Sequence, residues 1–262
     1  MQPESCELSD LNLRQREVWK IAKSEGLVQV DRLAEKLNVS AQTIRRDLNQ
    51  LTQARLLQRI HGGAITFDSV VNLGYGARKL LAPEGKVRIA EKAAELIPND
   101  CSLFINIGTT TEQVAAELTR RHQGLLIVTN NLNVINTVVQ NDQIEVFIAG
   151  GQIRPQDGGI VGNTTADFVS QFRVDFAIIG ASSIEEEGIV TDFDWREVRV
   201  AKTMIRHARE VMLVADSNKF KRKAPIFLCD LKEIDYFLTD TEVPERFLQN
   251  AIANNVNVHI CD

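Results

Sequence analysis

The sequence predicts an α/β protein in which a small, mostly helical N-terminal domain precedes a larger domain with a mostly parallel sheet. Two observations lead to this prediction. Three short amphipathic stretches fall within the first 51 residues. From about residue 79 onward, short runs that are apolar along their whole length alternate with helical patterns. Such strands, separated by helices, are typical of a parallel sheet covered on both faces.

The composition fits a globular protein without a membrane segment. The chain has 262 residues, of which 44% are hydrophobic, and it contains no run of 18 apolar residues. Its first ten residues, MQPESCELSD, carry acids where a signal peptide needs a basic start and an apolar core. We therefore expect a cytoplasmic protein that does not bind membranes.

The cysteines are scattered along the chain, at Cys6, Cys101, Cys229 and Cys261, and form no Cys-x-x-Cys pair. This spacing argues against a zinc finger and against a disulfide framework, and it favours reduced thiols. Cys101 and Cys229 are better interpreted as core residues than as nucleophiles. No metal site and no cofactor is expected.

The first domain has the spacing of a helix-turn-helix. Residues 13–24 and 30–37 each place apolar side chains on one side, which predicts two short helices. Asn38-Val39 makes a tight turn, and residues 39–51 (VSAQTIRRDLNQL) predict a third helix. Two helices, a short turn and a polar-faced helix are the helix-turn-helix arrangement.

The third helix carries its polar groups opposite an apolar stripe. Ser40 can cap its start, because the hydroxyl accepts a bond from a free backbone N–H. Ile44, Leu48 and Leu51 recur at i, i+4 and i+7 and share one face. The opposite face and its flanks carry Gln42, Thr43, Arg45, Arg46 and Asn49. Amide, guanidinium and hydroxyl groups are those that contact bases and phosphates, so these five residues and Ser40 are the candidate DNA contacts on this helix, with Asp47 as the one acid among them. The alternative is an ordinary surface helix of a larger domain.

The basic charge of the chain is local. The net charge is −5, but residues 1–66 hold ten Lys and Arg against eight Asp and Glu, which gives +2. The remainder holds 20 against 27, which gives −7. Residues 41–61 alone hold four Arg and one Asp. A local basic patch is what a DNA-facing surface requires, although a chance excess is also compatible with these counts.

A hairpin is expected after the third helix. Residues 56–66 (LLQRIHGGAIT) read as two short strands around His61-Gly62-Gly63. A hairpin in this place is a wing, in which Arg59 and His61 would contact phosphate; His61 could instead be a loop residue without a contact. Residues 67–78 have no clean period, so we expect a linker there and a second domain at 79–262.

These motifs carry a resemblance to a known family. Residues 40–48 (SAQTIRRDL), followed by 61–64 (HGGA), resemble the winged helix-turn-helix of the DeoR family of bacterial sugar-metabolism regulators. The resemblance implies that the third helix enters the major groove of double-stranded operator DNA, with Gln42, Thr43, Arg45 and Arg46 as contacts. One such helix reads only a few base pairs, so a homodimer or homotetramer is expected.

The second domain should contain seven strands and six helices. Strands are expected at 103–107, 125–129, 144–149, 174–180, 211–215, 236–239 and 256–260. Helices are expected at 84–97, 110–121, 132–140, 164–172, 198–208 and 244–254.

Small and polar residues follow several of these strands. Ligands of open α/β sheets bind outside the carboxyl ends of the strands. The turn at 108–111 (GTTT) opens a helix and is the best candidate for an anion site, because backbone N–H groups and the helix dipole both favour negative charge. The alternative for any single loop is an ordinary β-to-α turn. The candidate ligand-binding residues are Gly108, Thr109, Thr110, Thr111, Asn130, Asn131, Gly150, Gly151, Gly180 and Lys219.

This half of the chain, from about residue 78 to 240, resembles the DeoR sensor domain, which shares its fold with ribose-5-phosphate isomerase and the CoA transferases. The isomerase's acid-bearing loop, Asp-Gly-Ala-Asp, corresponds to residues 179–182 (IGAS), which lack both carboxylates. Its general base would fall on Glu197 and its phosphate-side lysine on Lys219. Without the acids we expect binding without turnover. Glu197 would then accept hydrogen bonds from ligand hydroxyls, or serve only as a helix-start acid.

Four stretches, 105–111, 127–136, 149–162 and 167–180, resemble the members of the family that control glycerol catabolism. The resemblance implies a DNA-binding repressor that is released by a small phosphorylated polyol or sugar, with sn-glycerol 3-phosphate as the expected effector. At 219–221 the chain reads Lys-Phe-Lys where the family commonly has Lys-Phe-Gly, so Lys221 either tightens phosphate binding or is merely solvated.

Two other functions are compatible with parts of the sequence. One is a sugar-phosphate isomerase-like enzyme with an accessory DNA-binding domain, which the missing carboxylates argue against. The other is an adaptor that uses the winged fold as a protein-docking module, which predicts no salt-dependent affinity for DNA.

Overall fold

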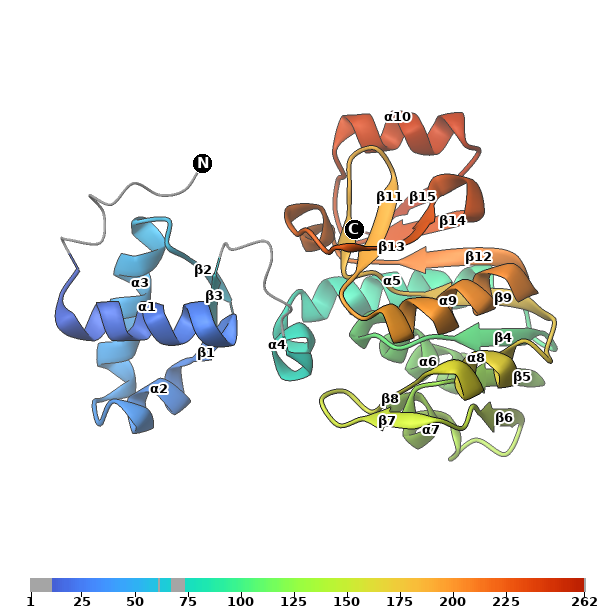
Figure 1. Cartoon of the computed structure of the whole chain (residues 1–262), viewed down its shortest axis with the longest axis horizontal. Helices are drawn as coiled ribbons and strands as arrows, with labels where there is room; N and C mark the ends of the chain where they lie inside the picture. Colours follow the sequence, from blue (N-terminus) through green and yellow to red (C-terminus); the bar gives the residue numbers. More distant parts are fainter. Residues whose placement is uncertain (1–10, 61, 67–73, 262) are drawn as a thin grey trace. The chain divides into compact units, whose positions relative to one another are not determined.

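The computed structural model describes residues 11–60, 62–66 and 74–261, and the chain divides into two compact units, Met1–Leu81 and Ala82–Asp262. His61 and residues 67–73 of the expected linker lie outside the described residues. We describe each unit by itself (Figure 1).

The first unit contains the three expected helices and the expected hairpin. They are α1 (Leu13–Glu25), α2 (Val30–Lys36), α3 (Ala41–Gln53), β2 (Leu57–Ile60) and β3 (Gly63–Thr66). A third strand, β1 (Leu27–Gln29), was not expected because three residues give no readable period. It pairs with β3 in the order β1-β3-β2. A Cβ at Gly63 would lie 2.1 Å from the carbonyl oxygen of Val28, so this close approach requires glycine.

The apolar stripe of α3 forms the centre of this unit. Ile44, Leu48 and Leu51 are fully buried and pack with Val18 of α1. The turn before α3 is held by Asn38 in the left-handed region, with φ of 50°, which asparagine tolerates better than most residues. These contacts fix the orientation of the opposite, polar face of α3.

A short helix, α4 (Tyr75–Leu80), lies within the stretch that we expected to be a linker. Ala77 of α4 and Leu81 pack on Ile65 of β3. The helix has only one buried residue, so its sequence carries no clear periodicity. The domain boundaries stay a prediction.

The second unit is built on a seven-stranded sheet in the order β15-β14-β12-β9-β4-β5-β6, with every neighbouring pair parallel. The strands are β4 (Ser102–Ile105), β5 (Leu125–Thr129), β6 (Ile144–Ile148), β9 (Val174–Ile179), β12 (Ala208–Val214), β14 (Tyr236–Thr239) and β15 (Asn257–Ile260). The predicted mostly parallel α/β fold is confirmed.

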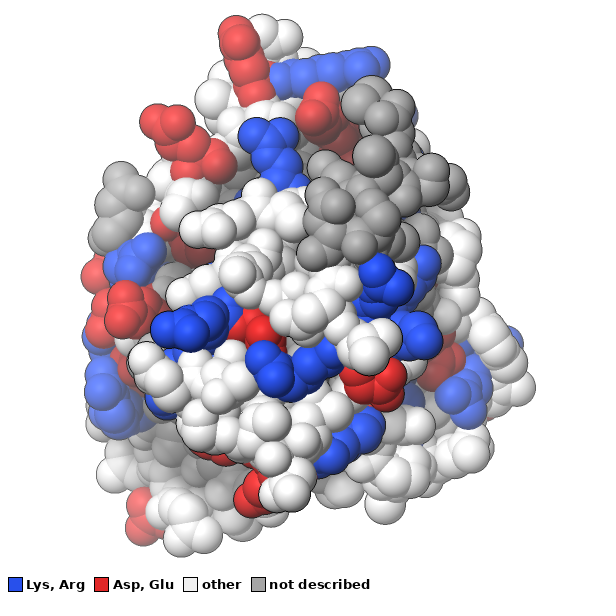
Figure 2. All heavy atoms as spheres, turned by 90° about the vertical axis from the view of Figure 1, so that its left-hand side faces the viewer, with Lys and Arg blue, Asp and Glu red and all other residues white. Residues whose placement is uncertain are grey.

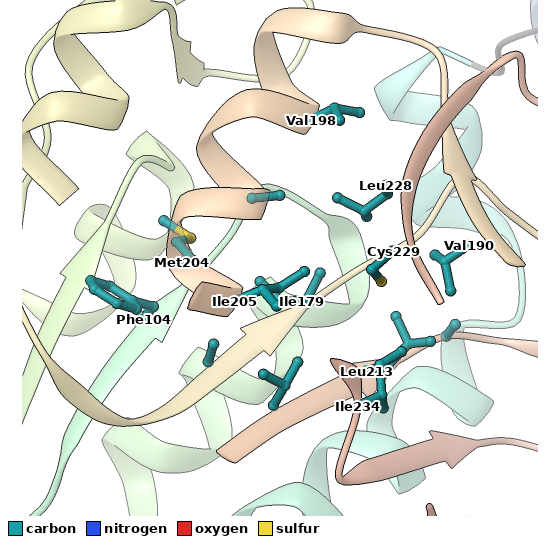
Figure 3. Packing of buried hydrophobic residues seen from close by; sticks show 14 of the residues in the cluster. Phe104, Ile179, Val190, Val198, Met204, Ile205, Leu213, Leu228, Cys229 and Ile234 are labelled. Atoms are coloured by element: carbon teal, nitrogen blue, oxygen red, sulfur yellow. The ribbon is translucent and has the colours of Figure 1, made fainter. Parts of the chain in front are cut away.

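Helices cover both faces of this sheet. They are α5 (Pro83–Leu96), α6 (Thr109–Arg121), α7 (Leu132–Val138), α8 (Asn163–Val169), α9 (Trp195–His207) and α10 (Glu245–Ala253). On one face Ile89, Val114 and Val134 of α5, α6 and α7 pack on the sheet. On the other, Met204 of α9 lies in a core with Phe104 of β4 (Figure 3).

Short strands that we did not expect complete the unit. β7 (Gln152–Arg154) and β8 (Gly159–Val161) form a hairpin, and β10 (Ser183–Ile184), β11 (Ile189–Asp192) and β13 (Ile226–Asp230) form a small antiparallel sheet. Two 3₁₀ turns, η1 (Ser217–Lys221) and η2 (Leu231–Glu233), follow β12 and β13. Leu228 and Cys229 of β13 point into the same core as α9 (Figure 3).

The three described cysteines, Cys101, Cys229 and Cys261, are buried and unpaired. Burial raises the pKa of the Cys101 thiol to about 11, so it is protonated at neutral pH. In the ranges that the structure describes, no helix is long and apolar enough to cross a membrane.

Candidate DNA-binding surface and ligand site

The start of α3 is held by its own side chains. Ser40 is the N-cap, and its hydroxyl accepts a hydrogen bond from the Thr43 N–H at 3.2 Å. The two hydroxyls of Ser40 and Thr43 also lie 2.8 Å apart. Ser40 therefore has a structural role, and Thr43 is partly occupied by the cap.

The exposed side of α3 has the composition that the sequence predicted, with one correction. Gln42, Arg45, Arg46 and Asn49 are all exposed. We counted Asp47 among the polar flank, and that placement is wrong, since Asp47 is only 2% exposed. The exposed side is therefore free of acid along these residues.

Asp47 is a structural residue that joins α3 to α1. Its carboxylate accepts hydrogen bonds from Arg14, at 2.5 and 3.2 Å, and from the Gln15 side chain at 3.4 Å. The hydrogen bond to Asp47 raises the pKa of Arg14. Gln15 also donates to the side chain of Gln50. The sequence did not indicate this contact, because the partners are 33 residues apart.

Figure 2 shows one face of the molecule, on which Lys and Arg side chains spread across the middle with scattered acids between them. In the wing, Arg59 on β2 is half-buried, and one of its terminal nitrogens is buried without a hydrogen-bond partner in the described part of the chain. His61 lies outside the described residues, so its expected contact stays a prediction.

In the second unit the parallel strands bring several predicted residues to one edge of the sheet. Gly108, Asn130, Gly180 and Lys219 follow β4, β5, β9 and β12, which are consecutive neighbours in the sheet. Carboxyl ends of parallel strands meet at the same edge, where ligands of such sheets bind.

The turn before α6 is closed by a threonine. Thr109, Thr110 and Thr111 are all buried. The Thr111 hydroxyl donates to the carbonyl oxygens of Asn106, at 2.7 Å, and Gly108, at 2.8 Å. Thr111 is thereby engaged within the protein, and the backbone of the turn remains the part suited to an anion.

The two asparagines after β5 differ in what they contact. Asn131 caps α7 by accepting from Asn133 N–H at 2.9 Å, and its amide donates to Glu112 at 3.1 Å. Asn130 donates to the carbonyl oxygen of Ile160 on β8 at 2.9 Å. Asn131 is therefore satisfied within the protein, whereas the Asn130 side-chain oxygen has no hydrogen-bond partner among the described residues.

The glycines after β6 pack against α8. The carbonyl oxygen of Gly150 accepts from the Thr165 hydroxyl at 3.0 Å. A Cβ at Gly151 would lie 2.1 Å from the same Thr165 oxygen, which explains the glycine there. At Gly180, by contrast, a Cβ would be in ordinary contact, 3.5 Å from the Ile107 carbonyl oxygen.

Lys219 belongs to a buried group of charges. Lys219 is 9% exposed, Lys86 of α5 is 3% exposed and Asp216 is 2% exposed. Burial alone would raise the pKa of Asp216, but the charges of Lys219, Lys86 and Arg222 and the hydrogen bond from Asn218 together lower that pKa. Asp240, after β14, accepts from Ser217 N–H at 2.7 Å. We did not predict Lys86, because a lysine in a helical first turn looks solvated in sequence. Lys221 is exposed.

Glu197 is paired with an arginine that we had not singled out. Arg154 of β7 lies 2.5 Å from Glu197, 2.7 Å from Asp157 and 3.1 Å from Asp194. Nearly all of each side chain is buried, with Arg154 at 14% exposure. Arg196 and Arg154 together lower the pKa of Asp194 to about 2, the hydrogen bond from Arg196 being the larger cause.

This arrangement suits binding more than catalysis. Glu197 is held as an ion-paired carboxylate at the start of α9, and no second acid occupies 179–182. Among the described residues, no group of three or more His, Cys, Asp or Glu side chains is placed to hold a metal ion.

Known proteins resemble both units. The DeoR-like helix-turn-helix domain family matches residues 14–70, and the DeoR C terminal sensor domain family matches residues 82–241. The glycerol-3-phosphate regulon repressor of Escherichia coli (strain K12) is 43% identical over 248 residues, which are 95% of this chain and 98% of that protein. The repressor of the same name from Haemophilus influenzae is 41% identical over 251 residues, 96% of this chain and 97% of that one.

A second kind of relative is also similar along its whole length. The HTH-type transcriptional repressor CsqR of Escherichia coli (strain K12) is 37% identical over 244 residues, 93% of each chain. Among solved structures, ribose 5 phosphate isomerase A from Neisseria gonorrhoeae aligns with 53% of this chain and 53% of its own, with a TM-score of 0.39 and 17% identity. A likeness at that level says nothing about chemistry. From the two domain matches and the full-length relatives, the chain belongs to the DeoR family of DNA-binding transcriptional regulators.

Proposed function

We propose that this chain represses genes of carbohydrate or glycerol catabolism and leaves its operator DNA when it binds a small phosphorylated polyol, sn-glycerol 3-phosphate. The observation that carries the DNA-binding half is the exposed row Gln42, Arg45, Arg46 and Asn49 on α3, from which the neighbouring acid, Asp47, is withdrawn by burial. The names of two full-length relatives support the effector.

In the proposed complex α3 enters the major groove. Gln42 and Asn49 can pair with base edges, and the guanidinium groups of Arg45 and Arg46 contact bases or phosphates. Because one helix reads only a few base pairs, a second copy of the chain supplies the second half-site, in a homodimer or a homotetramer. Arg59 and His61 in the wing add phosphate contacts.

In the proposed ligand site the phosphate lies at the carboxyl edge of the sheet. Lys219 and Lys86 supply positive charge there, and the start of α6 supplies backbone N–H groups. The ligand must bind one arrangement of the two units better than the other, because only differential affinity shifts the population away from the DNA-competent state.

The test combines two measurements on the full-length protein. DNA selected by the protein from a random-sequence library is titrated by fluorescence anisotropy, with and without glycerol 3-phosphate, glycerol, inorganic phosphate or a set of sugar phosphates. Thermal unfolding in phosphate-free buffer reports binding directly, since a hundredfold excess over Kd stabilises the folded state by about 2.7 kcal/mol. Release and stabilisation by glycerol 3-phosphate alone support the proposal.

Other outcomes would change it. Release by a different sugar phosphate would keep the mechanism and replace the effector. Stabilisation by none of these compounds would remove the sensor half of the proposal while leaving the DNA-binding half in place.

A further inference from the structure

Two buried side-chain oxygens lie at the carboxyl edge of the sheet without a hydrogen-bond donor among the described residues. They are Oδ1 of Asn106, which is 2% exposed, and Oδ1 of Asn130, which is fully buried. A buried amide oxygen without a donor costs free energy, so buried polar groups are nearly always paired. Two such oxygens together need an explanation.

The two asparagines are neighbours in the sheet. Ile105 and Thr129 are register partners on β4 and β5, so Asn106 and Asn130 form the next pair. Asn106 continues the strand, because its N–H donates to the carbonyl oxygen of Ile178 at 3.0 Å. Side chains alternate along a strand, so both asparagines project to the face on which Phe104 packs. Neighbouring strands are about 4.8 Å apart, so the two oxygens can reach one small ligand.

The orientation of the Asn130 side-chain amide is fixed by the hydrogen bond that its nitrogen makes. Its Nδ2 donates to the carbonyl oxygen of Ile160 on β8, at 2.9 Å, and the Asn130 carbonyl oxygen accepts from the Ile160 N–H at 2.7 Å. The side-chain oxygen is therefore turned away from β8 and is left as a buried acceptor without a donor among the described residues.

We propose that the side-chain oxygens of Asn106 and Asn130 accept hydrogen bonds from two neighbouring hydroxyl groups of the ligand. They thereby select a phosphorylated polyol with adjacent hydroxyls and fix its direction in the site. This inference rests on the proposed function, since it assigns the polyol end of the same ligand.

Hydrogen-bonding chemistry distinguishes the place of the ligand's phosphate end from the place of its polyol end. An amide oxygen only accepts, and a phosphate dianion offers only acceptors, so the phosphate is excluded from the Asn106 and Asn130 end. Lys219 and Lys86 favour the anion at their own position on the edge. A hydroxyl can donate to an amide oxygen, so the polyol end fits where the phosphate does not.

The experiment pairs each asparagine with each hydroxyl. Isothermal titration calorimetry measures the Kd of sn-glycerol 3-phosphate, 3-hydroxypropyl phosphate and 2-hydroxypropyl phosphate, the last two lacking one hydroxyl each. The proteins are the wild type, Asn106→Ala, Asn130→Ala and the control Asn99→Ala. Asn99 is exposed at the loop before β4, at the opposite end of that strand, where its side chain accepts from Gln123 N–H at 3.1 Å.

The expected result is a coupling between side chain and hydroxyl. The wild type should bind each analogue on the order of tenfold more weakly than glycerol 3-phosphate, and each Ala variant should lose about tenfold for glycerol 3-phosphate. One analogue lacks the hydroxyl that the substituted asparagine is proposed to bind. For that analogue each variant should bind as well as the wild type does, because the substitution and the missing hydroxyl remove the same hydrogen bond. Asn99→Ala should bind as the wild type does.

Asn106→Ala keeps the test valid if Asn130→Ala unfolds through loss of its Ile160 contact, because Asn106 is tested independently. Wild-type binding with no effect of Asn106→Ala, or with equal losses for all three ligands, would overturn the inference and leave the proposed function intact. Wild-type protein that binds none of the three phosphates would overturn glycerol 3-phosphate as the proposed effector, and this inference with it, while leaving the proposed DNA binding in place.

Discussion

The guanidinium of Arg14 on α1 lies 2.5 Å from the carboxylate of Asp47 on α3, on the side of α3 that faces the core. Asp47 is 2% exposed, whereas the side chain of Arg14 is 38% exposed. The pair therefore holds α3 on its core-facing side. It also keeps Asp47, the only acid among residues 41–53, off the exposed surface of the helix. Asp47 and Asn49, two positions apart, should respond to substitution in opposite ways.

Asp47→Asn should lower the stability of the protein and leave the DNA affinity of the folded protein unchanged. The loss should be about 1 kcal/mol, because solvent screens the partly exposed Arg14. Asn49→Asp should do the reverse, with stability within about 0.5 kcal/mol of the wild type and weaker DNA binding, because it places an acid on the exposed face. Urea unfolding and fluorescence anisotropy measure the two effects. Tighter DNA binding by Asp47→Asn at unchanged stability would mean that Asp47 faces the DNA.

Arg46→Ala should weaken DNA binding and reduce its dependence on salt. A phosphate contact contributes about one unit to the slope of log K against log salt, and a base contact about 1–3 kcal/mol of affinity. Arg46 is exposed, so its loss should not destabilise the fold. The measurement is a salt titration of DNA affinity, with Lys232→Ala, an exposed lysine of the second unit, as control. Loss of ligand binding in the folded Arg46→Ala protein would contradict the division of labour between the units.

The fold could be predicted from the sequence wherever burial leaves a recognisable spacing of apolar residues. The central strands of the parallel sheet, such as β4, β5 and β9, are mostly apolar, and each of the seven strands was found within a few residues. β7 and β10 were missed because they have three and two residues, and the side chains of β7 are mostly exposed. Their pairing depends on tertiary contacts that leave no local pattern.

The site was predictable only in part, for a similar reason. The loops after the strands could be placed, since parallel strands share one carboxyl edge. The partners of the charged residues could not, because Arg154 is 43 residues from Glu197 and Lys86 is on a different helix from Lys219. Asn106 was missed because it lies one residue beyond the strand and looks like part of the run Ile105–Ile107.

Lys219→Ala should yield a protein that still binds DNA but is not released by glycerol 3-phosphate. Removing Lys219 takes away one of the two lysines that hold the buried Asp216, so some loss of stability should accompany it. Lys221→Ala is the matched control, because that lysine lies two positions away and is exposed. Anisotropy with and without glycerol 3-phosphate distinguishes them. Normal release from the Lys219→Ala protein would take Lys219 out of the site.

The lowered pKa of Asp194 predicts how the stability of the protein depends on pH. Its pKa is lowered to about 2, below the ordinary value near 3.9, so its contribution is complete above about pH 4 and is lost as pH falls towards 2. The contribution is at most about 2 kcal/mol, since Arg196 is partly exposed and screened. Urea unfolding of the wild type and Asp194→Asn should differ most above pH 4 and converge towards pH 2. If the difference in free energy of unfolding between the two proteins stayed constant from pH 4 to pH 2, the ionisation of Asp194 would not be its cause.

Arg154→Met should be strongly destabilising, because it leaves the carboxylates of Asp157, Asp194 and Glu197 close together without their shared cation. Removing one partner of a buried ion pair costs about 3–5 kcal/mol. Adding Glu197→Gln should recover part of that loss, since it removes one of the crowded charges, whereas Glu197→Gln alone should destabilise the wild type. A double-mutant cycle by urea unfolding measures this coupling. Additive effects would mean that Glu197 is held by something other than Arg154.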